Sequence, residues 1–160
     1  MGEFGGFVLA RALHVLGVVM WIGGVAFVTT VLIPALRRID PPGARLALFE
    51  QLEGRFAWQA RLTTLLTGLS GFYMLHFLHA WDRYQQSQFW WVHLMTTVWV
   101  IFTLVLFVLE PLFLHRRFHE LAISDNGRAF RLVQRMHVLL LSLSLFAVAA
   151  AVVGAHGGLL

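Results

Sequence analysis

The chain has 160 residues, of which 59% are hydrophobic and only 12% are charged, and its formal net charge is +4. A soluble domain carries about 25% charged residues, so this composition excludes an ordinary soluble fold and indicates one membrane domain over residues 1–160. The absence of cysteine excludes disulfides, thiolate metal sites and cysteine nucleophiles. All twelve basic residues are arginines. We interpret them as topology signals, so no nucleic-acid partner is expected.

Four segments are apolar over about 20 residues, which is the length that a helix needs to cross a lipid bilayer. In chain order, these segments run over residues 7–36, 62–81, 90–114 and 137–157. The sequence therefore predicts an all-α fold: a polytopic four-helix bundle embedded in the membrane.

The linkers between these segments differ in their basic charge. Residues 37–61 and residues 115–136 each hold five arginines, whereas residues 82–89 hold only Arg83. Arginine-rich loops tend to stay in the cytoplasm. We therefore expect an integral protein of the inner (cytoplasmic) membrane, with both chain termini on the periplasmic or exterior side.

The arginine-rich linkers also carry structural signals. Leu46, Phe49, Leu52 and Phe56 recur at roughly helical spacing after a PPG break. They could form an interfacial amphipathic helix or extend the second predicted helix inward. In the other linker, SDNG at 124–127 is the turn signal, so the third and fourth helices are expected to project beyond the bilayer and turn there.

A faint internal repeat relates the first and third predicted helices. VLIPALRR ends the first and VLEPLFLHRR ends the third. Trp21 and Pro34 are 13 residues apart, and Trp99 and Pro111 are 12 apart. This pattern favours two parallel helical hairpins.

Three histidines lie within the predicted helices, each about one turn below the outer surface: His14, His76 and His93. A polar group in hydrocarbon needs a partner, and neutral imidazole is a common metal ligand. In helical bundles, cofactor sites are built from facing helices, and haem iron takes axial histidines. Alternatively, each ring could bond a backbone carbonyl or reach the headgroups.

The residues around His14 are also compatible with a haem. Gly17 could leave room for the macrocycle or for close helix packing, and Arg11 could bind a propionate or anchor the helix at the interface. Met95 could act as an axial ligand, since Met/His ligation of haem exists. The predicted metal ligands are His14 with His76 or His93. The predicted cofactor-binding residues are His14, His76, His93, Arg11, Gly17 and Met95.

Two motifs carry a resemblance to a known group of proteins. ALHVLGVVMWIGGVAF at 12–27 resembles the first helix of HemJ-type protoporphyrinogen oxidases and related copper resistance protein D-like membrane proteins. WVHLM at 91–95 resembles the Trp-x-His-x-Lys start of the HemJ third helix. The resemblance implies that His14 is a haem ligand and that His93 matches the second histidine. Met95 stands where the oxidase pattern has the lysine that the family associates with activity.

A second polar group is predicted on the inner side. His115 and His119 are four residues apart and share a helix face, and His137 begins the fourth predicted helix nearby. Glu110 and Glu120 accompany them. This set could form a metal site, a proton-entry path or a quinone contact. It could also be a solvated, salt-bridged cytoplasmic face.

The function predicted from the sequence is a haem b-binding membrane redox protein, either a cytochrome b-like electron carrier or a HemJ-like oxidase, with its haem near the outer face. A quinone or another redox protein is the expected partner. The alternative is a copper-handling transporter, because Met20, Met74 and Met95 lie on three helices and thioethers suit Cu(I). A third hypothesis is an accessory subunit of a larger respiratory complex. The small extramembrane mass is also compatible with a homo-oligomer.

Overall fold

The computed structural model describes residues 3–157, and all regular structure in that range is helical, as predicted. η1 and η4 are π-helical, whereas η2 and η3 are short 3₁₀ helices. The elements in chain order are α1 (Glu3–Phe27), η1 (Val28–Leu32), α2 (Ile33–Leu36), α3 (Pro42–Phe77), η2 (Trp81–Gln85), η3 (Ser87–Phe89), α4 (Trp90–Leu104), η4 (Val105–Leu114), α5 (His115–Ser124) and α6 (Asn126–Ala155).

Three continuous helical runs are long and apolar enough to cross a membrane: Phe4–Leu36, Ser87–Ser124 and Asn126–Ala155. They support the prediction of a membrane protein. The predicted segment 62–81 is helical as far as Phe77 but is not among these three runs. The hydropathy of this part of α3 is lowered by Arg61, His76 and several hydroxyl side chains, which include the buried Thr64.

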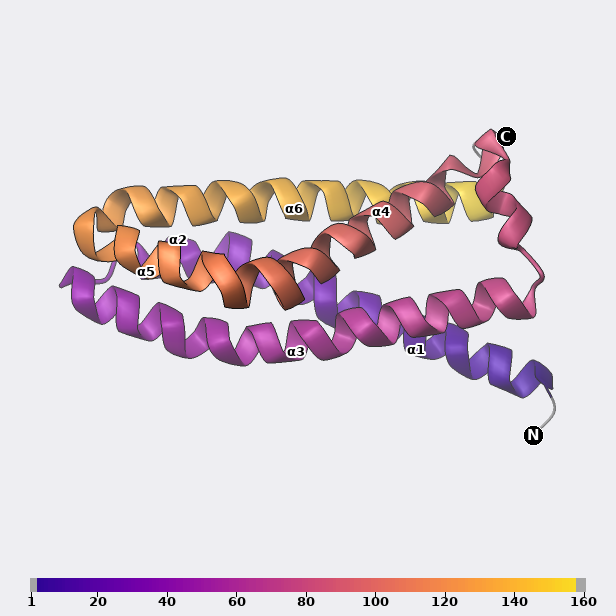
Figure 1. Ribbon diagram of the computed structural model, residues 1–160, viewed down its shortest axis with the longest axis horizontal. Helices are drawn as coiled ribbons and strands as arrows, with labels where there is room; N and C mark the ends of the chain where they lie inside the picture. Colours follow the sequence, from indigo (N-terminus) through magenta and orange to yellow (C-terminus); the bar gives the residue numbers. More distant parts are fainter. Residues whose placement is uncertain (1–2, 158–160) are drawn as a thin grey trace.

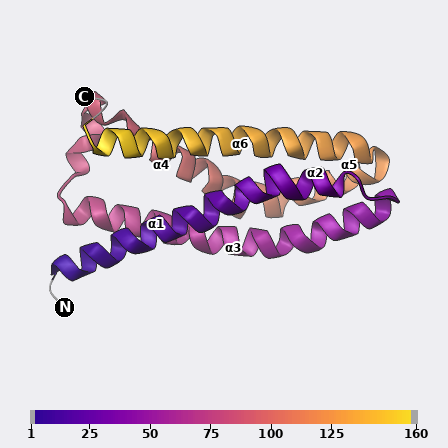
Figure 2. The same ribbon diagram turned by 180° about the vertical axis from the view of Figure 1, so that it is seen from behind.

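The long helices run along one axis (Figures 1 and 2). α1 packs mainly on α3, whereas α4 and α5 pack on α6. The start of α1, the end of α6 and the η2–η3 connection lie at one end, which we call the terminal end. The α2–α3 connection and the α5–α6 turn lie at the other, which we call the arginine-rich end.

The apolar stripe of the first arginine-rich linker belongs to α3, so the interpretation that the second predicted helix extends through this linker is confirmed. Leu46 and Phe49 are buried. The Phe49 ring lies 4.8 Å from that of Phe118 and 5.4 Å from that of Phe130, measured between centroids. The stripe therefore faces neighbouring helices, which the alternative of a separate interfacial helix did not predict.

The far end of α3 differs from the predicted boundary at residue 81, because the helix ends at Phe77. The N–H of Ala80 donates to the carbonyl of Leu75 at 2.9 Å, and the N–H of His79 donates to that of His76 at 3.1 Å. These two bonds form a Schellman motif, with His79 in the left-handed region at φ 50°. Histidine is one of the non-glycine residues enriched in that region.

The turn predicted at SDNG is confirmed, and the helices on either side continue beyond the predicted spanning segments 90–114 and 137–157 to reach it, as expected. The third helical run continues to Ser124, and α6 begins at Asn126 rather than at residue 137. The carboxylate of Asp125 accepts a hydrogen bond from the N–H of Arg128 at 2.9 Å and caps α6. The runs of 38 and 30 residues would span about 57 and 45 Å, more than the ~30 Å hydrocarbon core.

A proline inside η4, Pro111, interrupts the backbone hydrogen bonding of this helix. In a π-helix, each N–H bonds the carbonyl five residues earlier, so Pro111, which has no N–H, leaves the carbonyl of Leu106 without its helical donor. The Nε–H of Arg61 in α3 donates to this carbonyl at 3.0 Å. A side chain of α3 thus compensates for the proline and ties α3 to η4.

Candidate functional site

His14 lies half-buried on α1, facing α3. Its Nδ1 is 2.9 Å from the carbonyl oxygen of Thr67 and 3.3 Å from the hydroxyl of Ser70. Because a carbonyl only accepts, Nδ1 carries the proton and Nε2 keeps the lone pair in the neutral ring. Histidines that ligate metals commonly have this second bond to a carbonyl. His14 therefore fits the role of a metal ligand, although the same bond also satisfies the ring without a metal.

The other two predicted ligands differ in their hydrogen bonding. His93 is exposed at the start of α4, with Nε2 3.0 Å from the carbonyl oxygen of Tyr84 and Nδ1 3.4 Å from that of Phe89. Both ring nitrogens thus face backbone carbonyls. His76 is exposed near the end of α3, and its ring makes no hydrogen bond within residues 3–157. Of these two, His76 is the more available ligand.

The glycines near His14 accommodate protein side chains. A Cβ atom on Gly17 would lie 2.5 Å from the hydroxyl oxygen of Thr67, and one on Gly71 would lie 3.1 Å from Cε1 of His14. Gly17 therefore serves the close packing of α1 on α3, which is the simpler of the two roles expected for it. Gly71, in turn, makes room for the imidazole ring itself.

The remaining predicted residues do not gather around His14 into a metal-binding trio. Arg11 is exposed, and Met95 packs against a buried cluster that includes Trp91. Across residues 3–157, one group of three side chains has its ligand atoms within 4.8 Å of one another, and it contains none of the three predicted histidines. A haem needs only two axial ligands, so a pair that includes His14 stays a prediction.

The group that does converge lies toward the arginine-rich end and consists of Glu53 on α3, Glu110 on η4 and His115 at the start of α5. Arg61 forms an ion pair with Glu110, and the two side chains are 26% and 18% exposed. Burial raises the pKa of Glu53, and the negative charge of Glu110 raises it further. Glu53 is thus suited to hold a proton.

This group does not resemble a prepared cation site. The guanidinium of Arg61 already neutralises Glu110, and its positive charge would oppose a metal ion placed beside the same carboxylate. A raised pKa at Glu53 likewise opposes metal binding, because a carboxylate ligand must first lose its proton. The arrangement favours a protonatable site.

The group borders a cavity of about 230 Å³ enclosed by α1, α3, α4, η4, α5 and α6. Most of the lining is apolar. The side chain of Trp21 is 3% exposed, and its indole N–H has no hydrogen-bond partner among the described residues. The polar and charged residues of the lining, together with the indole, are Trp21, Glu53, Glu110, His115, Arg117 and His137.

His137 contributes to this cavity from α6. Its Nδ1 donates to the carbonyl of Val133 at 3.0 Å, which leaves Nε2 as the lone-pair nitrogen of the neutral ring. Three members of the predicted inner group, Glu110, His115 and His137, therefore share one cavity. His119 and Glu120 are not among the residues that line it.

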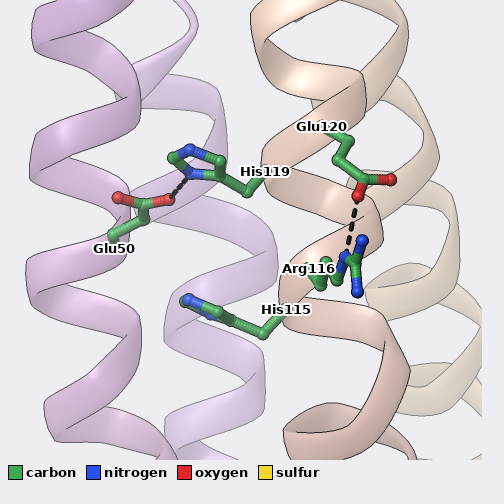
Figure 3. Close-up of a pocket in the computed structure, with 5 residues that line it drawn as sticks. All are labelled: Glu50, His115, Arg116, His119 and Glu120. Atoms are coloured by element: carbon green, nitrogen blue, oxygen red, sulfur yellow. Dashed lines mark hydrogen bonds and ion pairs between the residues drawn. The ribbon is translucent and has the colours of Figure 1, made fainter.

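Figure 3 shows where the rest of the inner group lies. His115 and His119 project from the same side of α5, as their spacing predicted, and this side points toward α3. His119 Nδ1 lies 2.6 Å from a carboxylate oxygen of Glu50, and Arg116 donates to Glu120 at 2.9 Å. These four pairing partners form the salt-bridged face that was one of the alternatives for this segment. These side chains line a shallow surface pocket, and His115 borders both this pocket and the cavity of about 230 Å³, which we call the inner cavity.

The sequence reasoning did not single out Glu53 or Arg61 as site residues. A usable signal exists for Glu53. It lies within a stripe of apolar residues at helical spacing, Phe49, Phe56 and Ala57, and a carboxylate in such a stripe faces the protein interior. Arg61 gives no such signal, because its role follows from a carbonyl freed on another helix.

No protein-family model, no curated protein and no solved structure matches this chain. The resemblance to HemJ-type oxidases and copper resistance protein D-like proteins therefore depends on the motifs at 12–27 and 91–95 alone and stays an expectation.

Proposed function

We propose that this protein is an integral membrane redox protein that binds haem b near the terminal end, with His14 as one axial ligand. The observation that carries the proposal is the bond from His14 Nδ1 to the carbonyl of Thr67, which leaves Nε2 free for iron. His76 is the proposed second ligand, because its ring is unengaged and it lies on α3, the helix that packs on α1. When bound, haem would supply one-electron chemistry.

The proposed architecture is a four-helix membrane bundle of two parallel hairpins, in which residues 62–77 of α3 form the fourth spanning segment. Most hydroxyls on the polar face of this segment bond within the helix, which favours its placement in a membrane, whereas the hydroxyl of Thr64 has no partner among the described residues. Thr67 donates to the carbonyl of Thr63 at 2.8 Å, and Ser70 donates to that of Leu66. The packing of α1 on α3 and of α4 on α6 supports the pairing into hairpins.

The proposed orientation places the arginine-rich end in the cytoplasm and both termini outside. Because the chain has no cysteine, single cysteines can report this directly. Gln86→Cys, in the connection at the terminal end, should react with a membrane-impermeant maleimide in intact cells. Ser124→Cys, at the arginine-rich end, should react only after permeabilisation. The reverse pattern would refute the proposed orientation.

Haem binding is tested by purifying the protein in mild detergent and recording oxidised and dithionite-reduced visible spectra with a pyridine haemochrome assay. We expect a Soret band and reduced α and β bands. His14→Ala and His76→Ala should lose haem, whereas His93→Ala should retain it. His119→Ala is the matched control, because this histidine lies away from the terminal end and its Nδ1 pairs with the carboxylate of Glu50.

Two results would count against this proposal in different ways. A protein that stays colourless after haem reconstitution would refute the haem-binding function, and copper-dependent uptake into vesicles would then be measured for the transporter alternative. A His14→Ala variant that keeps its full haem content would refute the ligand assignment alone.

A further inference from the structure

The inner cavity has the size and lining of a small ligand site. Its volume of about 230 Å³ is below the ~300–1,000 Å³ typical of sites for drug-sized molecules, so it suits a single substituted ring rather than a macrocycle. Leu132, which belongs to the lining, is 50% exposed, so the lining reaches the surface of the chain.

The indole of Trp21 indicates what such a ligand must offer. Its N–H is buried without a partner among residues 3–157, and a buried donor left unpaired costs stability. An oxygen acceptor on a ligand would remove that cost, whereas a metal ion would not, because an N–H group does not ligate cations. The Trp21 ring also packs edge-on against Phe102 at 4.8 Å, which fixes the indole against α4.

The titratable side chains of the lining supply the complementary chemistry. The pKa of Glu53 is raised by burial, so its carboxyl group can donate a hydrogen bond. The Nε2 of His137 can accept one, because Nδ1 already donates to Val133. His115 borders both the cavity and the exposed pocket of Figure 3, so its side chain lies between the cavity and the surface. The lining can therefore form hydrogen bonds with both carbonyl and hydroxyl oxygens of a ligand.

We propose that this cavity binds the headgroup of a membrane quinone or quinol. Such a headgroup is an apolar ring with oxygens at opposite edges, each of which exists as a carbonyl or a hydroxyl. Trp21 donates to one ring oxygen, and Glu53 and His115 contact the other. The site is distinct from the haem position proposed at the terminal end, and quinone binding does not depend on haem.

The test is a calorimetric titration of decylubiquinone into the purified full-length protein in mild detergent. Glu53→Met keeps the side-chain length and removes the hydrogen-bonding carboxyl group, and Trp21→Phe removes the indole N–H together with part of the ring system. We expect each variant to weaken binding about tenfold. The matched controls are Trp58→Phe and Glu50→Met. Both controls are on α3 and outside the cavity lining, so they should bind as the wild type does.

A second readout separates ligand binding from packing. Trp21→Phe truncates a buried side chain, so the ligand-free variant should be less stable than the wild type in either case. The separating readout is the stabilisation by decylubiquinone, which should fall in Trp21→Phe if the indole N–H binds the ligand. If the indole served only the fold, that stabilisation would be unchanged.

Three results would overturn the proposal. The first is a wild-type protein that does not bind decylubiquinone, and the second is wild-type affinity in both Trp21→Phe and Glu53→Met. The third is tight binding of Mn²⁺ or Zn²⁺ that His115→Ala abolishes, which would identify a metal site. His14→Ala should still bind decylubiquinone even when it is colourless, so failure of the haem proposal would leave this result readable.

Discussion

Replacing Arg61 by methionine should destabilise the protein through two separate contacts. The variant removes the ion pair with Glu110, and it removes the hydrogen bond to the carbonyl of Leu106 that Pro111 leaves without a helical donor. Methionine keeps a similar length and apolar stem, so the change is confined largely to these polar contacts.

The magnitude follows from the burial of the pair. Breaking a fully buried ion pair by removing one partner costs about 3–5 kcal/mol. Arg61 and Glu110 remain 26% and 18% exposed, so we take about 2 kcal/mol for the pair, allowing for solvent screening. The unsatisfied carbonyl of Leu106 adds about 1 kcal/mol. The expected loss is therefore about 3 kcal/mol in the free energy of unfolding.

Two backgrounds separate these terms. Pro111→Ala restores an N–H that can bond Leu106, so Arg61→Met should cost about 1 kcal/mol less in that background. Glu110→Gln removes the unpaired charge, so Arg61→Met should cost about 2 kcal/mol less there. The assay is unfolding by sodium dodecyl sulfate titration in mixed micelles at pH 7. Arg55→Met, an exposed position on the same helix, should change stability by no more than about 0.5 kcal/mol.

The reasoning is refuted if Arg61→Met costs less than the exposed Arg55→Met control plus experimental error. It is also refuted if its cost is the same in the wild-type, Pro111→Ala and Glu110→Gln backgrounds. Equal costs would mean that Arg61 stabilises the fold through neither contact.

Two other predictions concern α3. Gly68→Ala places a Cβ 2.5 Å from the ring of Trp99, and this overpacking should lower the free energy of unfolding by about 1–3 kcal/mol. Gly54→Ala, with open space around it, should raise the free energy of unfolding by about 0.5–1 kcal/mol. Thermal unfolding of both variants compares them, and equal effects would contradict the packing argument. Because the pKa of Glu53 is raised in the folded state, the folded protein binds more protons than the unfolded one. The free energy of unfolding should therefore fall as pH rises from the unfolded pKa of about 4.3 through the raised folded pKa. Glu53→Gln should flatten this fall. Unfolding free energies measured over that pH window test this, and an unchanged slope would contradict it. The charged and titratable groups that act on Glu53 are Glu50, Arg61, Glu110 and His115.

The sequence by itself determined the helical class and the main turns, because both depend on local patterns. Long apolar runs predict helices in a membrane, and SDNG predicts the turn that Asp125 caps. The boundary of α3 at the terminal end was predicted less well. The helix ends at Phe77 and is followed by His79 in the left-handed region, and no glycine or proline marks that position.

Only the tertiary structure decided which polar residues meet. Glu53, Glu110 and His115 are far apart in the chain and converge because α3, η4 and α5 pack together. Arg61 acquires its role from a carbonyl freed by a proline on another helix, a relation that no spacing in the sequence encodes. The indole of Trp21 likewise lacks a partner within the described part of the chain because neighbouring helices enclose it beside the cavity. Local periodicity sets which residues face inward, but the helix packing sets which of them share a site.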